Sequence, residues 1–305
     1  MRGAMLELTG LKKRYGDVLA LSDCTFRAQP GRMLGFLGPN GSGKTTAMRS
    51  VFGLVHLDAG TVHWRGEPIR PEERARFGYM PEQRGLYPRM RVRDQAIYFG
   101  RLHGLSAAEA SASADRWLER LGLTDRADAR VEELSHGNQQ RVQLIVALVH
   151  EADLLILDEP FSGLDPIGVA ALGDVVREQA ARGAAVVFSS HQLDLVEDLC
   201  DDIAVIHRGR VVLDGSLDEV RAASPSRYVH ASVRAGRDGA TWAEHIEGTE
   251  LLWERGTEAR LRVPADADPA RLLAAVQAGG PVTFFRFEPP SLSDLFMEAV
   301  NEELV

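Results

Sequence analysis

The stretch GPNGSGKTT, residues 38–46, decides the fold of this chain of 305 residues. It contains the pattern G-x-x-x-x-G-K-[ST], whose glycines let the backbone turn tightly enough for successive N–H groups to point at one place. An apolar run at 33–37 precedes it, and a segment suited to a helix begins at Thr45. A strand, a loop and a helix N-terminus in this order attract an anion, most naturally a phosphate. These flanks favour a phosphate-binding loop in an α/β sheet over a chance glycine-rich turn.

Lysine usage singles out Lys44 within this loop. Of the 35 lysines and arginines in the chain, only Lys12, Lys13 and Lys44 are lysines. A broad planar guanidinium cannot replace a compact ammonium inside a narrow loop, so a lysine here reflects a chemical requirement. We expect Lys44 to reach the β- and γ-phosphates of a bound nucleotide, and the hydroxyl of Thr45 to bind Mg²⁺.

A second apolar run, at 154–157, ends in two adjacent carboxylates, Asp158 and Glu159. Parallel sheets bind ligands at the carboxyl ends of their strands, where these side chains are expected. Two buried acids without a cation would be costly, which makes a purely structural pair the weaker interpretation. We expect Asp158 to hold Mg²⁺ through water, and Glu159 to orient and deprotonate the water that attacks the γ-phosphate.

The segment LSHGNQQR, residues 134–141, distinguishes this chain from other phosphate-loop proteins. Its apolar continuation VQLIVALV predicts a helix with Ser135 as its N-cap. With this segment in place, the chain resembles the ATP-binding subunits of ABC transporters. The most frequent family form is LSGGQ, so His136 and Asn138 are departures, whereas Ser135 and Gly137 are retained. We interpret the segment as a working variant; the alternative is a helix that is merely capped.

The resemblance implies how this signature segment works. In the family, two subunits associate head to tail about a two-fold axis, and each ATP lies between one subunit's phosphate loop and the other's signature segment. We therefore expect a homodimer in which Ser135, Gly137 and Asn138 contact the ATP of the partner, aided by the positive end of their helix. Hydrolysis would remove the bridging phosphate and let the dimer open.

Four further residues take their predicted roles from the resemblance. Tyr15 corresponds to the ring that stacks on adenine, and Gln83 to a glutamine that contacts Mg²⁺, the attacking water and the transmembrane partner. His191 corresponds to the switch histidine that holds the γ-phosphate and positions Glu159. Asp165, in SGLDP at 162–166, corresponds to the key residue of the loop that faces the opposite subunit. Taken alone, these residues would be interpreted as a packing tyrosine, a solvated glutamine, a helix-capping histidine and an ordinary turn.

These assignments define a site for ATP and Mg²⁺. The predicted catalytic residues are Gln83, Glu159 and His191, and the predicted Mg²⁺ ligands are Thr45, Gln83 and Asp158. The predicted ATP-binding residues in the same chain are Tyr15, Gly38, Pro39, Asn40, Gly41, Ser42, Gly43, Lys44, Thr45 and Thr46.

Composition limits the partners of the chain. The net charge of −9 and the absence of a basic run argue against broad contact with nucleic acid or lipid headgroups. No apolar run approaches the roughly 18 to 20 residues that span a bilayer, and the N-terminus lacks a signal-peptide pattern. We expect a cytoplasmic protein without direct membrane insertion, held at the inner face of the cell membrane by separately encoded transmembrane permease subunits. Cys24 and Cys200 lack metal-ligand spacing and are expected to be reduced, packed thiols.

Motif positions and turn-forming residues predict two domains. Residues 1–221 are expected to form an ABC-type ATP-binding domain, a P-loop NTPase (RecA-like) sheet with a helical subdomain inserted at about 84–150. Ser135 follows Gln83 by 52 positions, too short a separation for the coiled-coil arm of chromosome-maintenance ATPases. The stretch SPS at 224–226 marks the boundary, and residues 222–305 are expected to form a small accessory α+β domain.

The pattern of the second domain predicts a ferredoxin-like module. It comprises a strand at 227–233, a short helix at 240–246, a hairpin at 250–263 that turns near Gly256, a helix at 268–277, a strand at 282–287 and a last helix capped by Ser291. From residue 222 onward, 13 acidic residues face eight basic ones, which disfavours nucleic acid. Phe284, Phe285 and Phe287 are expected to pack in the core rather than to bind a ligand. The last helix resembles that of the efflux branch of the family, which includes sodium and drug exporters.

The sequence thus supports two functional hypotheses. The first is an ATP-hydrolysing subunit that powers an ABC-type exporter. The second is a soluble ABC-type ATPase that acts in macromolecular or cofactor assembly rather than in transport. A translation-type ABC factor would need two cassettes in one chain, and only one is present. Within this family the membrane subunits bind the substrate, so this chain does not reveal it.

Overall fold

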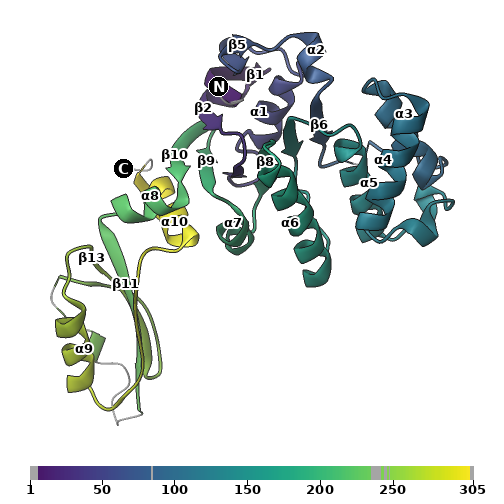
Figure 1. The fold of residues 1–305 in the computed structure, drawn as a ribbon. Helices are drawn as coiled ribbons and strands as arrows, with labels where there is room; N and C mark the ends of the chain where they lie inside the picture. The colour runs from purple at the N-terminus through teal and green to yellow at the C-terminus, as the bar shows by residue number, and fades with distance from the viewer. Residues whose placement is uncertain (1–5, 84, 235–241, 244–245, 247, 303–305) are drawn as a thin grey trace. The chain divides into compact units, whose positions relative to one another are not determined.

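A computed structural model describes residues 6–83, 85–234, 242–243, 246 and 248–302. The chain divides into two compact units, residues 1–216 and 217–305 (Figure 1). Among the described residues, no helix combines the length and the apolar character needed to cross a membrane.

The first unit is built on one ten-stranded sheet with the order β5-β4-β1-β2-β10-β9-β3-β8-β7-β6. Strands β9, β3, β8, β7 and β6 run parallel to one another, whereas β5, β4, β1 and β2 are antiparallel neighbours. The predicted α/β phosphate-loop sheet is confirmed. The strands are β1 Leu6–Tyr15, β2 Val18–Ala28, β3 Met33–Leu37, β4 Ala59–Trp64, β5 Glu67–Pro68, β6 Phe77–Met80, β7 Leu154–Leu157, β8 Ala185–Ser190, β9 Asp202–His207 and β10 Arg210–Ser216.

The central strands are apolar on both faces because helices cover both. Every residue of β3, β7 and β8 is buried, as a continuous apolar run in a parallel sheet requires. One part of the core gathers Phe36, Trp64 and Phe77 with the buried side of α1. The helices around the sheet are α1 Lys44–Val51, α2 Pro71–Arg74, α6 Pro166–Ala181 and α7 Leu193–Leu199.

The antiparallel and parallel parts of this sheet are joined by a narrow seam between β2 and β10. One residue pair, Arg210 with Asp23, is in parallel register there. The backbone N–H groups of Ser22 and Asp23 both donate to the carbonyl of Gly209, at 2.9 and 3.2 Å. Gly209 has φ of +80°, and a Cβ atom would lie 2.8 Å from the carbonyl oxygen of Ala20, so a side chain does not fit at the seam.

A helical insert lies between β6 and β7 (Figure 1). It contains α3 Val92–Leu102, α4 Ala107–Arg120, α5 His136–Leu148 and short 3₁₀ turns at Thr124–Arg126 and Val131–Glu133. Two residues divide the apolar pattern between Arg93 and Leu123 into two helices. Gly104, with φ of +94°, follows the end of α3. Ser106 begins α4 and forms a capping box with Glu109.

The second unit contains a four-stranded antiparallel sheet with the order β12-β13-β11-β14. Its elements are α8 Leu217–Ala223, β11 Ser226–Val233, β12 Glu250–Arg255, β13 Glu258–Pro264, α9 Pro269–Ala278, β14 Val282–Glu288 and α10 Leu292–Glu302. The first and third strands are central, as in a ferredoxin-like module. Most of the helix predicted at 240–246 lies outside the described residues.

Strand alternation divides the phenylalanines of β14 between the two faces of the sheet. Phe285 and Phe287 pack against the core of the unit beneath α9, as predicted. Phe284 is 36% exposed, so the prediction that it packs in the core was wrong. Successive side chains of a strand point to opposite faces, and three aromatic residues within four positions cannot share one face.

Candidate active site

The loop between β3 and α1 surrounds the ammonium group of Lys44. Gly43 has φ of +110° and serves as the N-cap of α1. A Cβ atom on Gly38 would lie 2.3 Å from the carbonyl oxygen of Ile206, so only glycine fits there. The Lys44 Nζ donates to the carbonyl oxygens of Gly38 at 2.6 Å and Pro39 at 3.2 Å. Burial lowers the pKa of Lys44, while the charges of Glu159, Asp158 and Glu82 oppose that shift. A positive charge therefore lies at the floor of the loop.

Two hydroxyl groups fix the carboxylate of Asp158, which is 1% exposed. The Thr45 hydroxyl donates to Oδ2 at 2.8 Å, and the Ser189 hydroxyl donates to Oδ1 at 2.6 Å. The Asp158 carboxylate and the Thr45 hydroxyl therefore present oxygen atoms side by side next to the loop. Hard oxygen ligands of this kind suit Mg²⁺ together with nucleotide phosphates.

Glu159, the next residue, turns its side chain in another direction. Its backbone has φ of +51°, and its N–H donates to the Ser189 hydroxyl at 2.8 Å. The carboxylate lies 3.0 Å from Nδ1 of His191, the residue after β8. Burial raises the pKa of Glu159, and the hydrogen bond from His191 partly offsets this. A carboxylate with a raised pKa that one histidine orients has the properties of a general base.

Lys44, Thr45, Asp158 and Glu159 face one cleft of about 380 Å³. Tyr15 lines its outer part; the ring is 49% exposed, with the ammonium of Lys13 5.1 Å from its centroid. An exposed ring beside a phosphate loop is available for stacking on a base. The other lining residues are Val18, Ala20, Asn40, Gly41, Gly43, Lys44, Thr45, Thr46, Glu82, Asp158 and Glu159.

Gln83 does not line this cleft. It lines a neighbouring hollow of about 370 Å³ with Glu82, His136, Gln140, Glu159 and Ser162. Glu159 borders both spaces. The structure therefore brings Gln83 close to the candidate base but does not gather it with Thr45 and Asp158.

The signature segment also lies outside the cleft lining. Ser135 is the N-cap of α5, and its hydroxyl accepts from the N–H of Asn138 at 3.4 Å, which confirms the predicted cap. A Cβ atom on Gly137 would lie 3.3 Å from the Leu164 side chain, so this helix start packs closely on the loop that holds Asp165. Asp165 in turn caps α6, accepting from the N–H of Gly168 at 2.7 Å.

Sequence patterns did not reveal two residues of the site. Ser189 connects Asp158 to the backbone of Glu159, and Glu82 adds a third acid to the cleft. A serine near the end of an apolar strand and an acid before Gln83 belong to none of the sequence motifs that mark this site. Proximity to Asp158 in the folded chain is their distinguishing feature.

The buried lysine, the glycine cradle and the paired acids at the strand ends define a phosphate-loop nucleotide-binding protein. A family model described as ABC transporter matches residues 21–162, and one described as the C-terminal domain of DrrA1-3-like ATP-binding proteins matches residues 215–300. The uncharacterized ABC transporter ATP-binding protein YhaQ of Bacillus subtilis is 38% identical over 97% of this chain and 99% of its own length. The Nod factor export ATP-binding protein I of Burkholderia lata is 33% identical over 99% of this chain and 98% of its own.

Solved structures agree with these matches. The ATP-binding subunit of an ABC transporter aligns with a TM-score of 0.67 and 33% identity, covering 72% of this chain and 92% of that one. A nucleotide-free ATP-binding cassette, at 23% identity and a TM-score of 0.64 over 72% of this chain and 94% of that one, supports the fold alone. The chain belongs to the ATP-hydrolysing, ATP-binding subunits of ABC transporters.

Proposed function

We propose that this protein binds and hydrolyses ATP in a head-to-tail homodimer to power an ABC-type exporter. The observation that carries the proposal is the convergence of Lys44, Asp158 and Glu159 on one cleft beside the phosphate loop, with His191 3.0 Å from the Glu159 carboxylate. The export direction is supported by the relative from Burkholderia lata, whose name denotes export and which matches this chain along nearly its whole length. ATP would be bound and hydrolysed on the cytoplasmic side of the membrane.

The residues of the cleft suit Mg²⁺ bound together with ATP. Thr45 and Asp158 would hold the ion, Asp158 through water, and Gln83 would approach it from the neighbouring hollow. The ion would neutralise charge on the phosphates. The Thr45 hydroxyl donates a hydrogen bond to the Asp158 carboxylate, and this bond keeps the oxygen atoms of both residues in place for the ion.

The signature segment would act on the ATP of a second subunit. Ser135, Gly137 and Asn138 do not line the cleft of their own chain, although Ser135 caps a helix of 13 residues whose N-terminus attracts anions. Asp165 lies on the adjoining loop and would face the opposite subunit. ATP would therefore join two chains, and hydrolysis would release them.

A mostly apolar groove of about 310 Å³ is the candidate docking place for a permease helix. It lies between β6 and the helical insert and is lined by Phe77, Tyr79, Leu86 and Phe99, among others. The buried Oε1 of Gln143, which also lines it, has no hydrogen-bond partner among the described residues. The amphipathic end of a cytoplasmic helix would cover the apolar wall and donate to this oxygen.

Glu159→Gln separates ATP binding from hydrolysis. An amide cannot accept the proton of the attacking water, so turnover should fall at least about 10²-fold while ATP binding persists. With Mg-ATP the variant should accumulate as a dimer in sedimentation velocity. Glu151→Gln, at an exposed site, is the control for charge removal. Hydrolysis by Glu159→Gln at the wild-type rate would contradict the general-base assignment.

Affinity purification from gently solubilised membranes of the native host tests the transport function. We expect a polytopic membrane protein in stoichiometric amount with the tagged chain. A variant with Tyr79 and Phe99 both changed to serine should lose that partner while keeping ATP binding. Recovery with soluble partners alone would favour the alternative of an ABC-type ATPase in macromolecular or cofactor assembly, and would leave the ATP-site assignments intact.

A further inference from the structure

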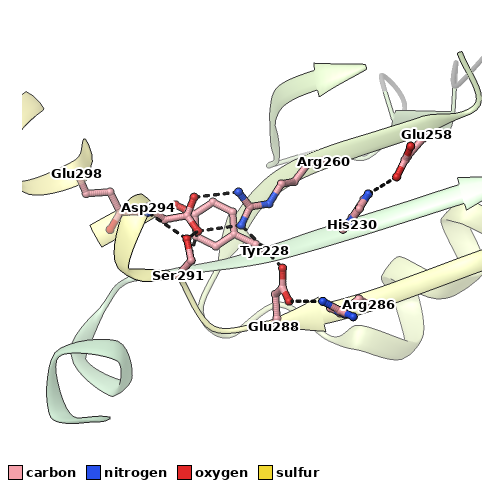
Figure 2. Close-up of polar contacts among 9 residues, drawn as sticks. All are labelled: Tyr228, His230, Glu258, Arg260, Arg286, Glu288, Ser291, Asp294 and Glu298. Carbon is pink, nitrogen blue, oxygen red and sulfur yellow. Dashed lines mark hydrogen bonds and ion pairs between the residues drawn. The ribbon is translucent and has the colours of Figure 1, made fainter. Parts of the chain in front are cut away.

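The sheet of the second unit has one face that α9 covers and one that it leaves open. Leu272 and Val276 of α9 pack with Val229, Ala231 and Leu261 in the core of the unit. Side chains alternate along a strand, so Tyr228 and His230 lie on the opposite face, where register places them beside residues of β13 and β14. Tyr228 contacts Glu298 of α10 and is only 2% exposed, so the open face is the part from His230 onward. Figure 2 shows the polar side chains of this open face and the start of α10 at one end of it.

Three aromatic side chains cross the open face as one strip. The rings of Trp253 on β12, His230 on β11 and Phe284 on β14 form edge contacts, with centroids 5.3 Å apart for Trp253 and His230 and 4.9 Å apart for His230 and Phe284. This aromatic strip runs from one edge strand to the other, and each end carries a guanidinium: Arg255 lies 5.2 Å from the Trp253 ring, and Arg286 lies 5.6 Å from the Phe284 ring. Phe284 is 36% exposed.

The two ends of the strip are alike, because each has an aromatic ring and an arginine, and His230 lies midway between them. A second copy turned by 180° about an axis that lies between the two faces, perpendicular to the strip and level with His230, would set Trp253 of one chain against Phe284 of the other, twice. Aromatic rings and their stacked guanidinium groups favour such contacts. An isologous interface requires this kind of surface, because the same patch must complement itself.

Charge supports a second copy over an anionic ligand. Residues 222–305 carry a net charge of about −5, with 13 acidic and eight basic residues, so most of their surface would repel an identical surface. The open face differs in charge, because its strands contribute four arginines and three glutamates to it. Three of those arginines are engaged with carboxylates: Arg260 with Asp294 at 2.8 Å, Arg286 with Glu288 at 3.6 Å, and Arg262 with Glu250. A nearly neutral face on which three of the four arginines are already paired suits another protein surface better than phosphates.

We propose that the open face of this C-terminal sheet, centred on the aromatic strip, is an isologous contact between two copies of this chain. The contact would be independent of nucleotide, unlike the proposed ATP-joined dimer, and neither depends on the other. The strip is small compared with a stable interface of about 800 Å² per partner, so the association should be weak in isolation. Chains that ATP or the permease already holds together would form it readily, because the second contact is then intramolecular.

Sedimentation velocity of the full chain, without nucleotide and with a chelator, tests this contact over a concentration series. We expect wild type to show a concentration-dependent dimer, and Phe284→Glu to weaken it at least about tenfold because a charge replaces an aromatic ring in both copies of the Trp253–Phe284 contact. Gln277→Glu adds the same charge on the exposed side of α9, and should leave the dimer unchanged. Circular dichroism and ATPase rates check that both variants are folded. Equal dimer strength in all three proteins, or a monomer at every concentration, would overturn the proposal.

Disulfide trapping tests the geometry. Mixed chains carrying Trp253→Cys and Phe284→Cys should form a heterologous disulfide faster than either forms with itself, because the two-fold axis sets these positions opposite each other. Burial raises the pKa of Cys24 to about 12 and that of Cys200 well above its usual value, so the native thiols react slowly. Gln277→Cys is the control. Random pairing, or binding of a single-stranded oligonucleotide that Phe284→Glu abolishes in a monomeric chain, would overturn the inference.

Discussion

Asp158 and Glu159 are adjacent residues with opposite surroundings. Two hydroxyl donors hold Asp158, whereas Glu159 is turned away by a left-handed backbone and lies against the ring of His191. The left-handed region costs a non-glycine residue about 1 kcal/mol or more, and such strain is common where a side chain must be aimed. The divided labour predicted for the pair thus has a structural basis in one backbone angle.

Lys44→Arg should abolish ATP binding although the charge is kept. The Lys44 Nζ is enclosed by the loop carbonyls of Gly38 and Pro39, and a guanidinium is too wide for that space. We expect affinity for a fluorescent ATP analogue to fall at least about 10²-fold, with the fold unchanged by circular dichroism. Lys12→Arg, on an exposed part of β1, should bind like wild type. Retained affinity in Lys44→Arg would show that the loop is wider in solution.

The pH dependence of hydrolysis should depend on the Glu159–His191 pair. Glu159 accepts a proton only when ionised, and its pKa is raised by burial, so the rate should fall as pH drops through that raised pKa. The hydrogen bond from His191 lowers the Glu159 pKa; removing it in His191→Ala should therefore shift the acidic limb to higher pH. Steady-state rates between about pH 5 and 8 measure the shift. His56→Ala, at an exposed site, is the control, and an unmoved limb in His191→Ala would contradict the coupling.

The residues of the site could be predicted where a motif fixes both residue type and spacing. Lys44, Thr45, Asp158 and Glu159 belong to such motifs, and the structure sets them around one cleft. Ser189 and the exposed face of Phe284 could not be predicted, because each depends on which strands become neighbours and which face a helix covers. That information is contained in the register of the sheets rather than in local sequence.

At the scale of elements, α10 shows how a terminal helix is fixed to a sheet. Its cap, Ser291, forms a capping pair with Asp294. The Asp294 carboxylate also accepts hydrogen bonds from both terminal nitrogens of Arg260, at 3.0 and 2.8 Å. Farther along α10, Glu298 accepts from the Tyr228 hydroxyl at 2.9 Å (Figure 2). Polar anchors at successive turns thus set the position of α10 on the end of the sheet.

Asp294→Asn should destabilise the second unit. The Asp294 and Arg260 side chains are 10% and 20% exposed, so loss of the carboxylate would leave a largely desolvated guanidinium with only Glu288, 3.8 Å away, as a charge partner. We expect a cost of about 2 kcal/mol in the free energy of unfolding. Urea unfolding with two spectroscopic probes measures it. Asp266→Asn, on an exposed turn, should cost little, and equal losses for the two variants would show that the buried pair contributes nothing specific.

Elements were predicted best where the apolar run was unbroken. The strands β3 and β7 and the helix α5 follow directly from their sequences, whereas the division of the first insert helices depends on the single turn at Gly104 and Ser106. A glycine within a helical pattern is either tolerated or ends the helix, and the packing of α3 on α4 decides which.

At the scale of the whole molecule, the two units should unfold separately. Each has its own core, the first around the sheet of β3 and the second around β11 and α9. Calorimetry of Glu159→Gln should show two transitions, and Mg-ATP at about 100 times its Kd should stabilise the first unit alone, by about 2.7 kcal/mol. Adding Lys44→Arg should remove that shift. A single transition that moves as a whole with ATP would show that the units unfold cooperatively.

The seam between β2 and β10 has a mechanical consequence. Tyr15 belongs to the antiparallel side of the seam, and the loop that holds Lys44 follows β3 on the parallel side. A nucleotide whose base rests on Tyr15 and whose phosphates rest on Lys44 would bridge the seam, where β2 and β10 share a single pair in register. Filling the cleft would add a contact across that seam, and emptying it would leave the seam to the hydrogen bonds at Gly209 and to the core that the two parts share.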